Sequence, residues 1–198
     1  MAEAATPVSP LAHLARRLAT AAGAVRLREV TFLAQVNLRV DADGPAAPNI
    51  TRALGAALPV APNTVARHRD TSVLWLGPDE WLVVGPPGSQ GRLSGELRVA
   101  LVPEAGSVVD VSAHRTVVEI AGPAARAVLA KGCPLDLHQQ RFPVGRCAQT
   151  MLARAQVVLV PRTAEEPAYW VFVRASFADY LAEWLLDAAI EYGPGAAR

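Results

Sequence analysis

The stretch VVEIAGPAARAVLAKGCPLDL, residues 117–137, decides the fold prediction. It continues an apolar strand predicted over Arg115–Ile120, and the Gly122-Pro123 pair then turns the chain sharply. Proline is tolerated in the first turn of a helix, where its missing N–H would have no intrahelical partner, so a helix follows and ends by Gly132. Ala127–Leu129 pack this helix back onto the strand, as in an α+β fold.

Strands and helices alternate on both sides of this stretch. The further strands predicted by β-rich runs are Val30–Val40, Ser72–Leu76, Trp81–Val84, Ser107–Val111, Met151–Val160 and Tyr169–Val173. Helices are predicted over 11–22, 49–58 and 92–101, and from a capping box at Ser176 and Asp179 to Gly193-Pro194. We therefore predict two packed α+β subdomains of antiparallel or mixed sheet with helices: an N-terminal arm over 1–26, a first subdomain over 27–105 and a second over 106–198.

Composition limits the class of protein. A chain of 198 residues holds one large or two small domains at about 150 residues per domain. Its hydrophobic fraction of 52% argues against disorder. Nineteen basic and 18 acidic residues leave a formal net charge of +1, which predicts no nucleic-acid partner. No run approaches the roughly 18 consecutive apolar residues of a membrane span, so we predict no membrane partner either.

Two cysteines and the first residues indicate the compartment. Cys133 and Cys147 are interpreted as buried free thiols of a reducing compartment, because no paired Cys and His spacings complete a zinc site. Arg16-Arg17 invites a twin-arginine export interpretation, but the segment that follows is weakly hydrophobic and stops at Arg26. We expect a cytoplasmic protein.

The one arrangement suggestive of nucleophilic catalysis is Asp110, Ser112 and His114. On a strand these side chains share a face, but neighbours on that face are roughly 7 Å apart, which is too far for a Ser–His hydrogen bond. No G-x-S-x-G sequence exposes the serine. A polar strand edge or an interface is the favoured interpretation.

The other candidates are weaker still. The glycine-rich segment 85–91 lacks a following Lys-Ser or Lys-Thr, and its two prolines remove N–H donors that a phosphate loop needs. Asp79 and Glu80 are adjacent, so their carboxylates diverge. The acidic stripe Asp179, Glu183, Asp187 and Glu191 is a solvated helix face or a contact for a basic partner. The sequence thus predicts no catalytic, no cofactor-binding and no metal-binding residue.

Four strings nevertheless carry a specific resemblance. LWLGPDEWLVV (74–84), VDVSAHR (109–115), KGCPLDL (131–137) and RASFADYLAEWLLDAA (174–189) resemble the gamma subunit of heterotetrameric sarcosine oxidase, over about Leu27 to Tyr192. FLAQVNLR (32–39) and LPVAPN (58–63) are similar to the same family in the same order. More distantly, residues 117–137 resemble a unit of the folate-binding aminomethyltransferase fold that the glycine cleavage T protein shares.

The resemblance implies a function that the residues alone do not. It implies a structural subunit that works with alpha, beta and delta subunits in a complex that oxidatively demethylates sarcosine to glycine. The products include hydrogen peroxide and, with tetrahydrofolate, methylenetetrahydrofolate. FAD, FMN, NAD and tetrahydrofolate are expected on the partner subunits and not on this chain. The alternatives are a stand-alone folate-binding or aminomethyltransferase-like protein and, least favoured, a hydrolase that uses Asp110, Ser112 and His114.

Overall fold

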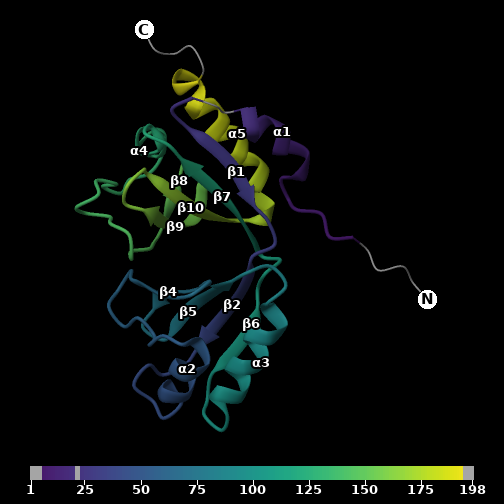
Figure 1. The fold of residues 1–198 in the computed structure, drawn as a ribbon, viewed down its shortest axis with the longest axis vertical. Coiled ribbons are helices and arrows are strands. Elements are labelled where there is room, and N and C mark those ends of the chain that lie inside the picture. The colour runs from purple at the N-terminus through teal and green to yellow at the C-terminus, as the bar shows by residue number, and fades with distance from the viewer. Residues whose placement is uncertain (1–5, 21–22, 194–198) are drawn as a thin grey trace.

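Two five-stranded antiparallel sheets lie in the middle of the molecule, and helices cover the outer side of each (Figure 1). The computed structural model describes residues 6–20 and 23–193. The first sheet has the order β1-β7-β10-β9-β8, and the second has the order β3-β4-β5-β2-β6. The molecule is therefore built in four layers, helix–sheet–sheet–helix, which confirms the predicted α+β class.

The strands of the first sheet come from both ends of the chain. They are β1 (Arg26–Val30), β7 (Arg115–Ala121), β8 (Ala148–Leu152), β9 (Ala155–Thr163) and β10 (Ala168–Arg174). The strands of the second sheet are β2 (Ala34–Arg39), β3 (Val65–His68), β4 (Thr71–Gly77), β5 (Glu80–Gly85) and β6 (Ser107–Asp110). Thus β6, which follows residue 106, pairs with β2 at the edge of the sheet formed by earlier residues.

The helices divide between the two outer layers. The layer on the first sheet contains η1 (Ala12–Leu14), α1 (Ala15–Thr20), α4 (Ala125–Ala130), η2 (Ala175–Phe177), α5 (Ala178–Ala189) and η3 (Ile190–Tyr192). The layer on the second sheet contains α2 (Ala47–Leu54) and α3 (Gln90–Leu101). In Figure 1, α1 and α5 lie together at one end of the molecule, and α2 and α3 at the other.

Alternation along the strands creates three apolar layers. In β5, Trp81 and Val83 face α2 and α3, whereas Leu82 and Val84 face the other sheet. In β10, Val171 and Val173 likewise face the helices, and Phe172 faces the other sheet. Strands buried on both faces lack polar alternation, because each face packs against apolar side chains. The layer between the sheets joins the two halves into one packed unit.

Two predicted strands are each divided in two. The run Val30–Val40 contains a left-handed residue, Phe32 (φ 57°), where the chain passes from β1 in one sheet to β2 in the other; only the last residue of β1 lies in the predicted run. The run that begins at Met151 reverses at Ala153 (φ 52°), and β8 and β9 form a hairpin there. A positive φ at a non-glycine residue is uncommon, so apolar composition alone did not reveal either break.

Two further predictions of local structure are wrong. Ser176 does not cap α5: the residue at the helix cap is Phe177, and no side chain bonds the first amides. The short turn η2 replaces the predicted capping box. The apolar spacing along this helix also favours burial of Phe177 and Tyr180, but these side chains are 44% and 39% exposed. The helix instead buries the face formed by Ala178, Leu181, Ala182, Leu185, Ala188 and Ala189.

Candidate functional site

Asp110, Ser112 and His114 lie in a turn and not on one strand. β6 ends at Asp110, and the Ser112 hydroxyl donates a 2.6 Å hydrogen bond to the Asp110 carboxylate. The backbone N–H of Gln35 donates to the same hydroxyl oxygen at 2.9 Å. The strand spacing expected between Asp110 and Ser112 is therefore wrong. Within the described residues no hydrogen bond joins Ser112 to His114, so this serine braces the turn against β2.

Asp79 and Glu80 belong to an ion-pair network on one side of the second sheet. The Arg39 guanidinium lies 3.6 Å from the Asp79 carboxylate and 3.3 Å from that of Glu80. Asn37 also donates to Glu80 at 2.7 Å. Both carboxylates thus contact polar groups of this chain.

The acidic stripe of α5 has partners within the same chain. His13 lies 3.3 Å from Asp179, and Arg17 donates to Glu183 at 2.7 Å. Glu191, beyond the end of α5, contacts Lys131. The N-terminal segment and Lys131 therefore supply basic partners to an acidic face that remains largely exposed to solvent.

Both cysteines are free and buried, as predicted. Burial raises the pKa of the Cys147 thiol to about 11. The Cys147 Sγ atom lies 3.4 Å from the carbonyl oxygen of Trp75, which accepts its S–H. In the described ranges 6–20 and 23–193, no three His, Cys, Asp or Glu residues gather as metal ligands would. Nor does any described helix have the length and apolarity needed to span a membrane.

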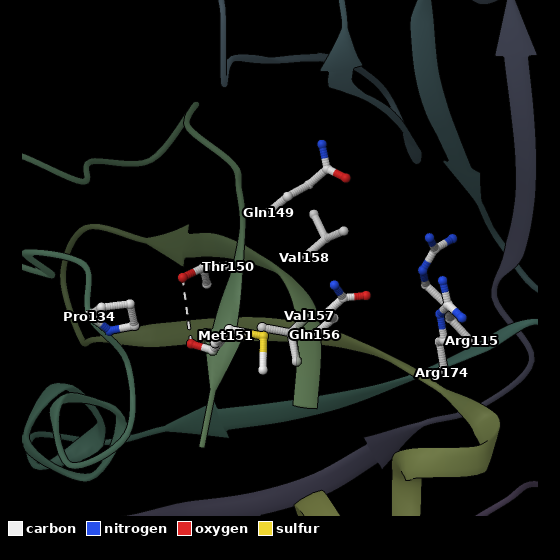
Figure 2. Close-up of a pocket in the computed structure, with 9 residues that line it drawn as sticks. All are labelled: Arg115, Pro134, Gln149, Thr150, Met151, Gln156, Val157, Val158 and Arg174. Carbon is white, nitrogen blue, oxygen red and sulfur yellow. Dashed lines mark hydrogen bonds between the residues drawn. The ribbon is translucent and has the colours of Figure 1, made fainter. Parts of the chain in front are cut away.

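A pocket of about 480 Å³ opens on the hairpin β8–β9 and the neighbouring ends of β7 and β10 (Figure 2). Arg115 and Arg174 form one end of the pocket, and Pro134 and Thr150 lie at the other (Figure 2). Its wall is completed by Gln149, Met151, Gln156, Val157 and Val158. Gln149 reaches across to the second sheet, where its amide donates to the carbonyl of Leu76 at 2.8 Å.

The antiparallel register brings the two arginines together. Arg174 on β10 is the direct cross-strand partner of Arg115 on β7. Like charges directly opposite each other on a sheet destabilise it. Burial and the charge of Arg174 lower the pKa of Arg115, and the Glu80 carboxylate raises it. Burial and the same two arginines lower the pKa of His114.

This arrangement can bind an oxyanion. In the described part of the chain, neither Arg115 nor Arg174 has a carboxylate within ion-pair distance. A guanidinium offers a planar fork of donors that matches a carboxylate, and the two glutamines add amide donors. The sequence analysis missed both arginines, because each is an ordinary strand-end residue until the register places them opposite each other. The strings VDVSAHR and RASFADYLAEWLLDAA contain Arg115 and Arg174, but neither string indicates that the two residues are neighbours.

The family model and the related sequences indicate the same protein family. Residues 39–191 match the model of the sarcosine oxidase, gamma subunit family. The sarcosine oxidase subunit gamma of an Arthrobacter species is 44% identical over 187 residues, which are 93% of this chain and 90% of that protein. The same subunit of Corynebacterium sp. strain P-1 is 42% identical over equal shares. The resemblance stated from the sequence strings is confirmed.

Solved structures agree on the fold. A heterotetrameric sarcosine oxidase from Corynebacterium sp. U-96, in complex with pyrrole 2-carboxylate, contains a chain that matches with a TM-score of 0.88 and 41% identity, covering 97% of both chains. The aminomethyltransferase T of the glycine cleavage system from Bartonella henselae matches with a TM-score of 0.63 at 16% identity. That match covers 93% of this chain and 52% of the transferase, and it shows a shared fold.

Proposed function

This chain belongs to the sarcosine oxidase gamma subunit family, and on that premise we propose that it is a structural subunit of a heterotetrameric sarcosine oxidase, without catalytic groups of its own. The observation that carries the proposal is the extent of the similarity. It covers nearly the whole of this chain and of a chain from a heterotetrameric enzyme, with no large insertion to hold an additional site.

The proposed complex oxidatively demethylates sarcosine to glycine, and forms hydrogen peroxide and, with tetrahydrofolate, methylenetetrahydrofolate. Its other members are alpha, beta and delta subunits, which we propose carry FAD, FMN, NAD and tetrahydrofolate, in the cytoplasm. The local geometry supports this division of tasks. The serine and the carboxylates considered for catalysis make hydrogen bonds or ion pairs that brace turns and strands of this chain.

The Arg115–Arg174 pocket is the place where we expect an acidic side chain of a partner subunit to bind. Arg174 is exposed and Arg115 is half-buried, so a carboxylate entering from outside meets both. Its negative charge would relieve the repulsion between the opposed arginines. An acidic side chain from a partner thereby converts an unfavourable cross-strand pair into a favourable contact.

The alternative of a stand-alone folate-binding or aminomethyltransferase-like protein has weaker support. The match to aminomethyltransferase T is one of fold, and this chain spans about half of the transferase. A transferase that works alone would need the groups supplied by the other half of that fold. The proposed subunit role needs only the part that is present here.

Co-expression tests the proposal. This chain, carrying an affinity tag, is produced with and without the other sarcosine oxidase subunits and analysed by gel filtration with detection at protein and flavin wavelengths. We expect a stoichiometric yellow complex in the first case. In the second case we expect a colourless chain with no sarcosine-dependent peroxide. A flavin that stays with the isolated chain, or failure to co-purify with the other subunits, contradicts the proposal.

A further inference from the structure

A second pocket, at the edge of the layer between the sheets, is lined by arginines and by an aromatic ring. It is a pocket of about 400 Å³ that we call the Arg162 pocket, and it lies where the ends of β9 and β10 meet the second sheet. Arg162 and Trp170 come from the first sheet, and Arg67 and the turn residues Arg69 and Asp70 come from the second. This pocket shares no lining residue with the Arg115–Arg174 pocket.

A β-bulge directs Arg162 into this position. Ala168 pairs with Thr163 and Tyr169 pairs with Pro161, so Arg162 is an extra residue without a partner across the ladder. Bulges redirect a side chain and are frequent beside binding sites. The guanidinium of Arg162 consequently lies over the ring of Trp170, with its Cζ atom 3.6 Å from the ring centroid.

The carboxylate of Glu119, whose charge acts on Arg162, already has other partners. Glu119 accepts two hydrogen bonds from Arg28, at 2.6 and 2.9 Å, and one from the Trp170 indole at 2.9 Å. Arg162 itself makes no ion pair with any described residue. The guanidinium rests against the Trp170 ring, and none of its N–H groups donates to an acceptor among the described residues.

Positive charge is concentrated around these donors. Arg67 donates to the carbonyl of Pro161 at 3.1 Å, which brings its guanidinium beside Arg162. Burial, and next the charge of Arg67, lowers the pKa of Arg162 to about 10, so the group stays charged at neutral pH. Arg67, Arg69 and Arg162 against Asp70 leave the lining with two more positive than negative groups.

Apart from Ser72, the rest of the lining carries no polar side chain. Leu33 and Val84 are buried members of the layer between the sheets, and the Trp170 ring lies next to that layer. Pockets of 300–1,000 Å³ with apolar walls and a few convergent polar groups are typical small-molecule sites. A bare inorganic anion would leave the apolar walls unused.

We propose that the Arg162 pocket binds a small organic molecule that carries an oxyanion, a carboxylate or a phosphate, on a flat or apolar group. The fork of Arg162, held by Trp170, binds two oxygens of the oxyanion, and Arg67 supplies the second charge. The organic group lies against Leu33 and Val84. This site is separate from the assembly role proposed above and does not depend on it.

Calorimetric titration tests the site. The probes are benzoate, phenyl phosphate and inorganic phosphate, added to the full chain and to the complex co-purified with its partner subunits. We expect benzoate or phenyl phosphate to bind both samples with a dissociation constant below about 1 mM, and inorganic phosphate to bind more weakly. Whichever organic probe binds more tightly identifies the oxyanion. In the full chain, binding should also change the fluorescence of Trp170, and Trp170→Phe should remove that change.

Matched variants locate the binding. Arg162→Gln and Arg67→Gln should each weaken the organic probe at least about tenfold, because each removes charged donors. Arg162→Lys, which keeps the charge and loses the fork, should also weaken it. Arg154→Gln, in the exposed turn between β8 and β9, should leave binding unchanged, and thermal melts verify that each variant is folded.

Three results overturn the proposal. The first is the absence of saturable binding by either organic probe. The second is equal binding by wild type and both glutamine variants, or binding of inorganic phosphate as tight as that of the organic probes. The third is binding to the isolated chain but not to the complex, which shows that a partner subunit covers the pocket.

Discussion

At the scale of single residues, Gly132 shows how tightly the outer layer on the first sheet is packed. A Cβ atom at this position would lie 2.7 Å from Cζ2 of Trp184 and 2.9 Å from the amide nitrogen of Ala153. One of these atoms belongs to the backbone, so the neighbours cannot all move aside. We expect Gly132→Ala to lower the free energy of unfolding by about 1–3 kcal/mol in urea titrations.

Gly95 is the matched control in α3. Its added Cβ meets no atom within 4 Å, and its backbone is ordinary helix. Gly95→Ala should therefore raise the free energy of unfolding, by about 0.5–1 kcal/mol, since alanine has the higher helix propensity. Equal effects of the two substitutions would contradict the packing described for Gly132.

The Cys147 thiol should make stability depend on alkaline pH. Its pKa is about 11 in the folded chain, against an ordinary value of 9.0. Between these values an unfolded chain loses the proton while the folded chain keeps it. Deprotonation then stabilises the unfolded state, so the free energy of unfolding falls as pH rises from about 9 to 11. Urea titrations at pH 8 and 10 measure the fall.

Other groups also titrate in this range, so Cys147→Ala serves as the reference. The variant should lose less stability than wild type between pH 8 and 10. The same pH dependence in both proteins would mean that burial does not hold the proton on this thiol.

At the scale of elements, the N-terminal arm is part of the core. Leu11, Leu14 and Leu18 are 0%, 6% and 1% exposed, and they belong to the apolar cluster shared by β1 and α5. Leu18→Ala should cost about 2–5 kcal/mol of folding free energy, as for other leucines removed from a core. Thermal and urea unfolding of the variant measure the cost, and Arg16→Ala on the exposed side of α1 is the control.

Sequence patterns predicted elements well where apolar spacing and turn residues agree. The hairpin β4–β5 is one example, with Gly77-Pro78-Asp79 between two apolar runs. The patterns failed where a strand is interrupted without glycine: at Phe32, where the chain changes sheets, and at Ala153, where it reverses. They also missed β3, whose residues VARH are only partly covered and show no clear alternation. Local composition indicates which residues are buried, whereas these strands are defined by the neighbouring strands with which they pair.

The candidate pockets were beyond prediction for a related reason. Arg115 and Arg174 become neighbours through the register of β7 and β10, and Arg162 reaches Trp170 through a bulge. The first arrangement depends on pairing between strands far apart in the chain, and the second depends on an irregularity within one hairpin that the residue types do not mark. Family resemblance, by contrast, lies in contiguous strings, which is why it could be recognised from the sequence.

At the scale of the whole molecule, each half of the chain contributes one strand to the sheet that the other half mainly forms. β1 precedes the second sheet but pairs in the first, and β6 follows residue 106 but pairs with β2. The apolar layer between the sheets then holds the halves together. Because of this exchange, we expect the two predicted subdomains to fold as one cooperative unit.

The exposed arginine pocket gives a prediction for assembly. Arg174→Glu should weaken co-purification with the partner subunits at least about tenfold, because a like charge would meet the acidic side chain expected there. Arg154→Glu, an exposed reversal of charge on the hairpin beside the pocket, should assemble as wild type does. Pull-down at two salt concentrations measures both variants. If Arg174→Glu assembled normally, the prediction that a partner subunit contacts the Arg115–Arg174 pocket would be contradicted.

The most direct test of a structural role is turnover per assembled complex. Asp110, Ser112 and His114 are replaced together by alanine, and sarcosine-dependent peroxide is measured in complexes shown to be fully assembled and flavin-loaded. We predict a rate within a few-fold of wild type, because residues that brace a turn lack the roughly 10²–10⁴-fold effect of acid–base groups. A loss beyond about a hundredfold in such complexes would show that this chain supplies chemistry and is not a structural subunit alone.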